Sequence, residues 1–494
     1  MISLAEVEVL AKRFNVIPIT KTLFAGTETP VGLYNKLCAT RPNTFLLESA
    51  EQGVWGRYSF IGVKNRGQIT SQMDSSQWTS NHNPLPSGNL SSEPIDALRQ
   101  LQAQWQSAPS EFPLTSGLVG FISWGLTEKL ENLPPRKAED YQIPLYSFLQ
   151  FSELVIVDHL KSEVVLVSVV FIDGVDSVAR KYESALAELG ELEESLWNPT
   201  PALISPIVEG VESFTANTTR EEFLSSVEKA KEFVRVGDVF QVVISQRFDQ
   251  EFQGDALDVY RSLRASNPSP YMYLIRMEDD NGPFDIVGSS PEALVKISKG
   301  RVITHPIAGS RPRSESATED LRLADELMAD EKERSEHLML VDLSRNDLLR
   351  VCKPETLQVS EFMQIHRFSH VMHLVSTVEG QLRNGMGAID ALLATFPAGT
   401  LSGAPKPRAL EIINNLEPTY RGLFGGVVGY FDFAGNSDLA IAIRTTVIRN
   451  GVSYVQAGAG IVLDSVPETE YQETLSKAAV VVKAIARAKG LANE

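Results

Sequence analysis

The sequence contains little cysteine, no excess of basic residues and no long uninterrupted hydrophobic run. Its 494 residues include only two cysteines, Cys38 and Cys352, which excludes a disulfide framework and favours a reducing compartment. The formal net charge is −18 at pH 7, and such an acidic surface repels phosphate backbones and anionic membranes. We therefore expect no nucleic-acid partner and no membrane association.

Targeting and membrane-spanning segments are also lacking. The N-terminal segment carries charges within its only apolar stretch, unlike a secretory signal peptide. The most apolar region, residues 153–175, is interrupted by charged residues every few positions and cannot span a bilayer as a helix. The sequence therefore predicts a soluble cytoplasmic protein.

A proline-containing stretch, residues 197–213, predicts a linker between an N-terminal region, residues 1–200, and a C-terminal region, residues 214–490. The C-terminal region combines many strand-like segments with a few long helices. Hairpin-like spacing between several of these segments favours antiparallel sheets over parallel βαβ units. We predict the α+β class.

One helix after the linker can be predicted in detail. Thr218 or Thr219, followed by Glu221 and Glu222, forms a capping box that marks its start, and Gly237 marks its end. A strand is expected directly after it, at residues 240–248. The helix places four apolar side chains on one face: Phe223, Val227, Ala230 and Val234.

Two acidic helices each carry a pair of carboxylates one turn apart. Glu333 and Glu336 form the first pair, Glu470 and Glu473 the second, and Lys477 follows one turn later. Carboxylate oxygens that leave positions open for water and a substrate carboxylate suit Mg²⁺. From the spacing alone, a solvated charged face is the favoured interpretation of either helix, and neither pair is specific for a metal unaided.

Two further positions and two glycine-rich segments are candidates for substrate binding or catalysis. Arg444 interrupts the apolar strand-like run 439–448, where a guanidinium needs a carboxylate partner, either a ligand or an internal salt bridge. His373 alternates with valines in a strand-like segment and is either a base or a buried structural histidine. Segments 396–406 and 456–462 lack complete nucleotide-binding motifs, so they are either turns or backbone amides that hold a carboxylate.

Taken together, these segments resemble the chorismate-utilising enzymes, and the resemblance extends over nearly the whole chain. That family implies large antiparallel β-sheets packed as a sandwich with helices on the outside. The motifs that carry the resemblance occur in order in the second half of the sequence: GDVFQVVISQRF, NPSPYMYLI, GSSPE, PIAGSRPR, EHLMLVDLSRNDL, VMHLVS, FPAGTLSGAPK, GGVVGYF, IAIRT, AGAGIV and EYQETLSKA.

Two residues distinguish the reactions within this family. Isochorismate-type synthases carry a lysine where this chain has Gln241, and aminodeoxychorismate synthases typically carry one where it has Ala308. Both residues indicate an anthranilate synthase large subunit, a lyase that makes anthranilate and pyruvate from chorismate and ammonia in tryptophan biosynthesis. Aminodeoxychorismate synthase or an aminodeoxyisochorismate-type synthase is the alternative activity. A catalytically inactive tryptophan-binding regulator is an alternative of another class.

The resemblance also implies roles for individual residues. Glu336 and Glu473 correspond to Mg²⁺ ligands, supported by Glu333 and Glu470. Glu292 corresponds to the general acid for loss of the C4 hydroxyl, which requires a raised pKa, and His373 to the base that removes the C2 proton. The residues expected to bind the substrate are Gln241, Ala308, Gly309, Ser310, Thr400, Gly403, Arg444, Gly458, Gly460 and Lys477.

The N-terminal segment LLESA resembles the feedback-binding segment of anthranilate synthases, although a short edge strand would also account for it. By similarity, a tryptophan pocket would be formed by Leu47, Glu48, Ser49, Pro270, Tyr271 and Met272.

Neither cysteine has the glycine-flanked context of a glutaminase nucleophile. The resemblance therefore implies that ammonia comes from a glutamine amidotransferase partner, usually in a heterotetramer of two large and two small subunits. Three positions depart from the family pattern: Ser310 replaces threonine, Ser314 replaces glycine and Phe424 replaces tyrosine.

Overall fold

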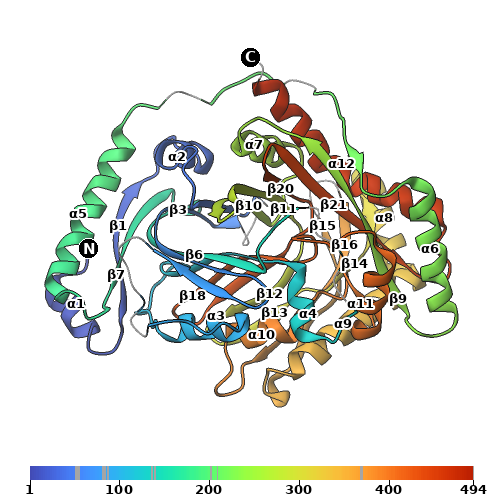
Figure 1. Cartoon of the computed structure of the whole chain (residues 1–494), viewed down its shortest axis with the longest axis horizontal. Helices are drawn as coiled ribbons and strands as arrows, with labels where there is room; N and C mark the ends of the chain where they lie inside the picture. The colour runs from blue at the N-terminus through green and yellow to red at the C-terminus, as the bar shows by residue number, and fades with distance from the viewer. Residues whose placement is uncertain are drawn as a thin grey trace.

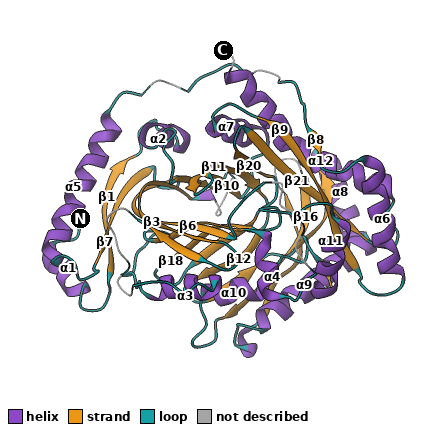
Figure 2. Ribbon diagram, viewed as in Figure 1, coloured by secondary structure: helices purple, strands orange, loops and turns teal. Residues whose placement is uncertain are grey.

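The computed structural model describes residues 1–50, 56–80, 85, 88–134, 137, 141–200, 203–207, 210–367 and 371–492. Its strands belong to one hydrogen-bonded network, and every ladder between named strands in these residues is antiparallel. Helices lie mainly around the outside of these strands (Figure 2). The predicted α+β class is confirmed.

The strands differ in length. Their bounds are β1 (Val16–Phe24), β2 (Thr44–Glu48), β3 (Tyr58–Ser71), β4 (Ser76–Thr79), β5 (Gly117–Ile122), β6 (Tyr146–Asp158), β7 (Glu163–Phe171), β8 (Thr215–Ala216), β9 (Gln241–Glu251), β10 (Tyr271–Asp279), β11 (Gly282–Ser290), β12 (Ala293–Ser298), β13 (Arg301–Thr304), β14 (Ile307–Pro312), β15 (Gln358–Arg367), β16 (Val371–Gln381), β17 (Gly403–Ala404), β18 (Val427–Asp432), β19 (Ser437–Ile441), β20 (Thr445–Arg449) and β21 (Val452–Ile461).

The helices differ widely in length, and among the described residues the short 3₁₀ turns η2 and η3 accompany them. Their bounds are α1 (Leu4–Leu10), α2 (Pro30–Leu37), α3 (Pro94–Ala103), η2 (Trp124–Leu126), α4 (Thr127–Leu130), α5 (Val178–Trp197), α6 (Arg220–Arg235), α7 (Ala256–Ser266), α8 (Ala317–Ala329), α9 (Glu331–Leu349), η3 (Pro354–Thr356), α10 (Ala388–Thr395), α11 (Lys406–Leu416) and α12 (Pro467–Ala492).

Strands from both sides of the predicted linker pair with one another. β2 lies between β3 and β10, and β5 pairs with β18, so LLESA does not form a sheet edge. α5, which precedes the linker, lies on one side of the molecule, and α6, which follows it, lies on the other (Figure 1). Linker residues 201–202 and 208–209 lie outside the described residues. The division into two regions stays a prediction.

The helix predicted after the linker is confirmed as α6. Thr219 is its N-cap, and a complete capping box joins Thr219 to Glu222. Phe223, Val227 and Ala230 are buried against the core, whereas Val234 is only partly buried. Gly237 has a φ of +86°, as expected for a glycine that ends a helix. The chain then enters β9, which forms one wall of the cavity described below.

The prediction of a single strand around Arg444 is wrong. The run 439–448 divides into β19, which pairs with β12 and β18, and β20, which pairs with β11 and β21. Arg444 lies in the break with a φ of +49°. Leu439–Ile441 and Thr445–Arg449 are buried on both faces, so apolar residues continue from one strand into the next, and no glycine or proline marks the corner between them.

No helix within the described residues is both long enough and apolar enough to cross a membrane.

Candidate active site

A cavity of about 770 Å³ lies where β9, β14, β16 and β21 meet helices α9 and α12. It is lined by both predicted catalytic residues, all four predicted metal ligands and every predicted substrate-binding residue except Gly403. Segments that are far apart in the sequence thus contribute to one site. A cavity of this size accommodates a small organic substrate.

Gly403 lies behind the cavity wall. It pairs with Val242 in the short β17–β9 ladder and has a φ of +140°. A Cβ atom at this position would lie 2.2 Å from the carbonyl oxygen of Gln241. The prediction that Gly403 contacts substrate is therefore not supported, because the glycine instead allows the 398–402 loop to approach β9 closely.

Glu292 follows β11 and lies in the cavity wall. The Thr400 hydroxyl donates a hydrogen bond of 3.0 Å to Glu292 Oε1. Burial raises the pKa of Glu292 to about 7, against the opposing effects of the Thr400 hydrogen bond and of the positive charges on Lys477 and Arg444. The carboxyl is therefore partly protonated near neutral pH, which a general acid requires.

His373 lies on β16 beside a bulge in β14. The register of the β14–β16 ladder shifts between Ala308 and Ser310, and Gly309 in the bulge has a φ of +69°. The carbonyl oxygen of Gly309 lies 2.9 Å from Nδ1 of His373 and can only accept a hydrogen bond. Nδ1 is therefore the protonated nitrogen, and the basic lone pair of the neutral ring is on Nε2. Burial lowers the pKa of His373, which keeps the ring neutral.

The carboxylates of α9 and α12 face the same cavity. Burial raises the pKa of Glu336, and the charges of Glu333 and Glu473 raise it further. Burial also raises the pKa of Glu470, with a contribution from Glu473. Carboxylates that repel one another in this way favour binding of a cation.

A ready-made metal cluster is not present: no three His, Cys, Asp or Glu side chains of the described residues are grouped closely enough to hold an ion alone. Mg²⁺ commonly keeps several waters and takes only one or two protein carboxylates together with substrate oxygens. The carboxylates at this site fit that manner of binding.

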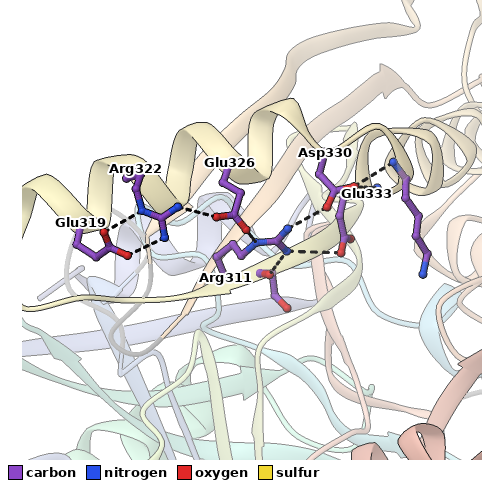
Figure 3. Close-up of polar contacts among 8 residues, drawn as sticks. Arg311, Glu319, Arg322, Glu326, Asp330 and Glu333 are labelled. Atoms are coloured by element: carbon purple, nitrogen blue, oxygen red, sulfur yellow. Dashed lines mark hydrogen bonds and ion pairs between the residues drawn. The ribbon is translucent and has the colours of Figure 1, made fainter. Parts of the chain in front are cut away.

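A chain of ion pairs holds the start of α9 against β14 (Figure 3). Arg311 of β14 forms ion pairs of 2.9 Å with Glu326 of α8 and with Asp330, and its Nη1 lies 3.7 Å from Glu333. Asp330 also caps α9 by accepting hydrogen bonds from the backbone amides of Lys332 and Glu333. These contacts fix the helical turn that carries Glu333 into the cavity.

Gln241 and Lys477 connect the substrate-binding and metal-binding residues. The Gln241 side chain lowers the pKa of Glu336 and lies over Gly460, where an added Cβ atom would meet Nε2 of Gln241 at 2.4 Å. Lys477 donates a hydrogen bond of 3.0 Å to the carbonyl of Gly458 and forms an ion pair of 2.7 Å with Glu473. Lys477 therefore contacts one predicted metal ligand, and Gln241 acts on the charge of another.

Arg444 forms no ion pair with any described side chain, so of the two partners expected from the sequence, a ligand carboxylate or an internal salt bridge, the described residues do not supply the second. It lies in the wall of the large cavity, where its charge acts on Glu292. The guanidinium is thus placed to meet an anionic ligand.

A second cavity of about 140 Å³ is lined by all six residues of the predicted tryptophan pocket. The buried Ser49 hydroxyl has no hydrogen-bond partner in the described structure. Glu48 accepts a hydrogen bond of 2.6 Å from the hydroxyl of Tyr260 and pairs with Arg264. Pro270 lines both cavities, so the segment around it separates them.

Sequence reasoning missed several residues of the two cavities. Gln456 lines the large one, and the period-two alternation with Gly458 and Gly460 on β21 would have identified it. Lys332 of α9 also lines the large cavity. The ion pair of Lys296 and Asp438, 2.8 Å apart in the small cavity, joins two strands and had no sequence signal.

The structure places all three residues that depart from the family pattern. Phe424 and Ser310 line the large cavity. The backbone amide of Ser314 donates a hydrogen bond of 3.1 Å to Asp320, and φ at Ser314 is not positive, so a serine is accommodated there.

The raised pKa of Glu292 has a consequence for stability. The folded protein holds this proton up to about pH 7, whereas the unfolded chain releases it near its ordinary value of 4.5. The contribution of Glu292 to the free energy of unfolding therefore falls as pH rises from 4.5 to 7. We therefore expect the stability of Glu292→Gln, measured relative to the parent protein, to increase between pH 5 and pH 8. Because the cavity admits solvent, which screens the effect, the increase should be on the order of 1–2 kcal/mol.

Urea unfolding at both pH values measures this difference. Glu228→Gln, on the exposed face of α6, controls for the loss of one negative charge. If the free energy of unfolding changed with pH in the same way for Glu292→Gln and the parent protein, the pKa of Glu292 would not be raised by folding.

Comparison with known proteins identifies the family. A family model described as chorismate binding enzyme matches residues 42–483. Anthranilate synthase component 1 of Mycolicibacterium smegmatis is 47% identical over 491 residues, covering 98% of this chain and 93% of that protein. The corresponding protein of Aquifex aeolicus is 41% identical over 497 residues, which cover 98% of this chain and 97% of that protein.

Solved structures agree with these relatives. Anthranilate synthase component I from Streptococcus pneumoniae superposes with a TM-score of 0.77 at 33% identity, covering 93% of this chain and 99% of that one. The menaquinone-specific isochorismate synthase from Escherichia coli, at 19% identity and a TM-score of 0.71, shares the fold and covers 97% and 99% of the two chains. The chain described here belongs to the family of chorismate binding enzymes.

Proposed function

We propose that this chain is the large subunit of an anthranilate synthase, which converts chorismate and ammonia into anthranilate and pyruvate, the first committed step of tryptophan biosynthesis. The observation that carries the proposal is the presence, in one cavity, of a carboxylic acid with a raised pKa and a neutral histidine. The relatives named anthranilate synthase component 1, at up to 47% identity, support the same reaction.

In the first stage, ammonia forms a bond to C2 of chorismate, the ring double bonds shift, and the C4–oxygen bond breaks. Hydroxide is a poor leaving group, so Glu292 donates its proton to this oxygen and water departs. The Thr400 hydroxyl, 3.0 Å from Glu292, orients the carboxyl.

In the second stage, Nε2 of His373 removes the C2 proton and pyruvate leaves as the ring becomes aromatic. The hydrogen bond to the Gly309 carbonyl keeps the imidazole in the tautomer that can accept this proton. Release of pyruvate separates this reaction from that of an aminodeoxychorismate-type synthase, which stops at an aminated product.

Substrate recognition depends on cations in a protein that is negative overall. Arg444, Lys477 and the amides near Gly458 and Gly460 would hold the enolpyruvyl carboxylate of chorismate. Glu336 and Glu473, supported by Glu333 and Glu470, would hold Mg²⁺. When bound, this ion supplies a positive charge that holds the ring carboxylate and stabilises negative charge as it develops.

A separate amidotransferase subunit would supply the ammonia. Burial raises the pKa of the Cys38 thiol to about 12 and that of the Cys352 thiol to about 11, so neither is activated as a glutaminase nucleophile. The relatives' designation as component 1 is consistent with a second component. We propose a heterotetramer of two large and two small subunits in the cytoplasm.

The small cavity is the proposed site of tryptophan feedback. Its apolar and aromatic lining suits an indole ring, and the buried Ser49 hydroxyl and the Lys296–Asp438 pair offer polar contacts for an amino acid. Pro270, which lines both cavities, provides the direct connection to the active site.

An assay with chorismate, magnesium chloride and ammonium sulfate tests the proposed activity. We expect fluorescent anthranilate and pyruvate in equal amounts without any partner subunit, and glutamine-dependent turnover only when a partner amidotransferase is added. An aminated product that keeps its pyruvyl group would instead identify an aminodeoxychorismate-type synthase. Absence of turnover together with tryptophan binding would identify a regulator.

Glu336→Gln and Glu473→Gln test the magnesium site. Because each substitution removes a charged oxygen ligand, we expect activity to fall by roughly 100-fold or more while the thermal midpoint of unfolding changes little. Glu331→Gln, exposed on the first turn of the same helix α9, is the matched control and should keep parental activity. Titration with Mn²⁺, followed by electron paramagnetic resonance, measures metal binding apart from turnover. Unchanged kinetics in both variants would remove the assignment.

Ser49→Phe tests the feedback site. The larger side chain fills the small cavity, so we expect turnover to persist while the tryptophan concentration for half-inhibition rises roughly tenfold or more. Ser225→Phe, on the exposed face of α6, is the control for adding an aromatic ring. Inhibition of Ser49→Phe at parental potency would place tryptophan binding elsewhere.

A further inference from the structure

Arg421 is a buried arginine that joins three segments around the active site. Its side chain is only 1% exposed and forms a bidentate ion pair with Glu417, which is 4% exposed. Two of the three remaining guanidinium hydrogens donate to the carbonyl oxygens of Leu401, at 2.7 Å, and Val243, at 2.9 Å. Leu401 and Val243 both line the large cavity.

Glu417 extends this network to another wall of the cavity. Its Oε1 accepts hydrogen bonds from both the backbone amide and the hydroxyl of Ser245, at 2.8 and 2.6 Å. The Ser245 hydroxyl in turn accepts a hydrogen bond of 2.8 Å from Gln456 of β21. The Arg421–Glu417 pair therefore links the 398–402 loop, β9 and β21.

The aromatic surroundings of Arg421 restrict it further. The guanidinium carbon lies 4.3 Å from the centre of the Trp124 ring, which comes from the N-terminal region, and 5.4 Å from that of Phe424. A planar guanidinium held between a carboxylate, two carbonyls and an aromatic face has one orientation in which all partners are satisfied.

Stability alone is a weak explanation for such a pair. Removing two charges from water is costly, and apolar side chains of similar volume commonly replace a buried ion pair without loss of stability. No apolar side chain, however, could hold the Leu401 and Val243 carbonyls at fixed positions. The pair is thus best explained by a requirement for precise placement of the loop.

The residue next to Leu401 is the one that contacts the general acid. The Thr400 hydroxyl donates to Oε1 of Glu292, and the loop is also tied to β9 by the hydrogen bond from the Val243 amide to the Ser402 carbonyl, at 2.9 Å. Fixing the Leu401 carbonyl therefore fixes the position from which Thr400 reaches Glu292.

We propose that Arg421, paired with Glu417, is a positioning residue that holds the 398–402 loop so that the Thr400 hydroxyl orients the proton-donating carboxyl of Glu292. This inference rests on the proposed function, because Glu292 is the general acid only in that reaction. Arg421 acts through Thr400 and contacts no substrate. The charged groups that act on Glu292 are Lys477 on α12 and Arg444 between β19 and β20.

A double-mutant cycle with Arg421→Lys and Thr400→Val tests the proposal. Lysine keeps the charge of Arg421 but cannot hold both carbonyls and the carboxylate in one plane. Loss of the Thr400 hydrogen bond removes a contact that favours the ionised carboxyl, so protonated Glu292 persists to higher pH. We expect each variant to lower kcat roughly tenfold, leave KM for chorismate nearly unchanged, and move the alkaline limb of the pH–rate profile upward by about half a unit.

Non-additivity is the decisive result. If Arg421 acts through Thr400, the double variant should resemble Thr400→Val alone in kcat and in the alkaline limb. The proposal would be overturned if the losses of kcat in the two single variants multiplied in the double variant. It would also be overturned if the alkaline limb of the pH–rate profile did not move in Arg421→Lys. Arg449→Lys is the matched control. Arg449 is equally buried, pairs with Asp279 and stacks on Phe284, but lines neither cavity, and its variant should keep the parental pH profile.

Two further measurements keep the test decisive. Glu417→Asp, which draws the carboxylate away from Arg421 by one methylene, replaces Arg421→Lys if that variant does not fold, and the same upward movement is expected. The infrared band of the Glu292 carboxyl, identified by its loss in Glu292→Gln, reports the protonation midpoint without turnover. A parent protein that makes no anthranilate would refute the proposed function. If the protonation midpoint of Glu292 were unchanged in Arg421→Lys and Glu417→Asp, only the positioning role would be refuted.

Discussion

Repulsion between like charges is the constraint on which the large cavity depends. Glu333 and Glu336 on α9 line the same cavity as Glu470 and Glu473 on α12; the charges of Glu333 and Glu473 raise the pKa of Glu336, and the charge of Glu473 raises the pKa of Glu470. The fold opposes this repulsion by anchoring the helices elsewhere. Arg311 and the Asp330 cap hold α9 to β14, and Lys477 neutralises Glu473 from one turn away. A protein with a net charge of −18 can therefore concentrate further negative charge at one point and still offer cationic side chains to an anionic substrate.

Local sequence patterns predicted the parts of this site that lie within single elements. The spacing of Glu333 and Glu336, and of Glu470 and Glu473, is a property of helices, so both pairs could be placed on helix faces before the fold was known. The capping box at Thr219 was predicted for the same reason. That all four carboxylates face one cavity could not be predicted, because this depends on how α9 and α12 pack on the sheet.

The errors and omissions arise where the chain changes partners or where distant strands meet. The corner at Arg444 carries no glycine or proline, so a change from one pair of neighbouring strands to another looks like one long strand. Gly403 was predicted to bind the substrate from its motif, and the sequence could not show that its backbone packs against β9, where a Cβ atom would meet the Gln241 carbonyl. Lys296 and Asp438 belong to different hairpins and share no sequence pattern.

The position of Pro270 between the two cavities has a thermodynamic consequence. A rigid residue that lines two pockets ties the shape of one pocket to that of the other. Such coupling is reciprocal: whatever factor a ligand in the small pocket imposes on affinity in the large one, a ligand in the large pocket imposes on the small. For the tryptophan site proposed above, substrate abundance would then set the sensitivity of the protein to that ligand, without any additional sensor.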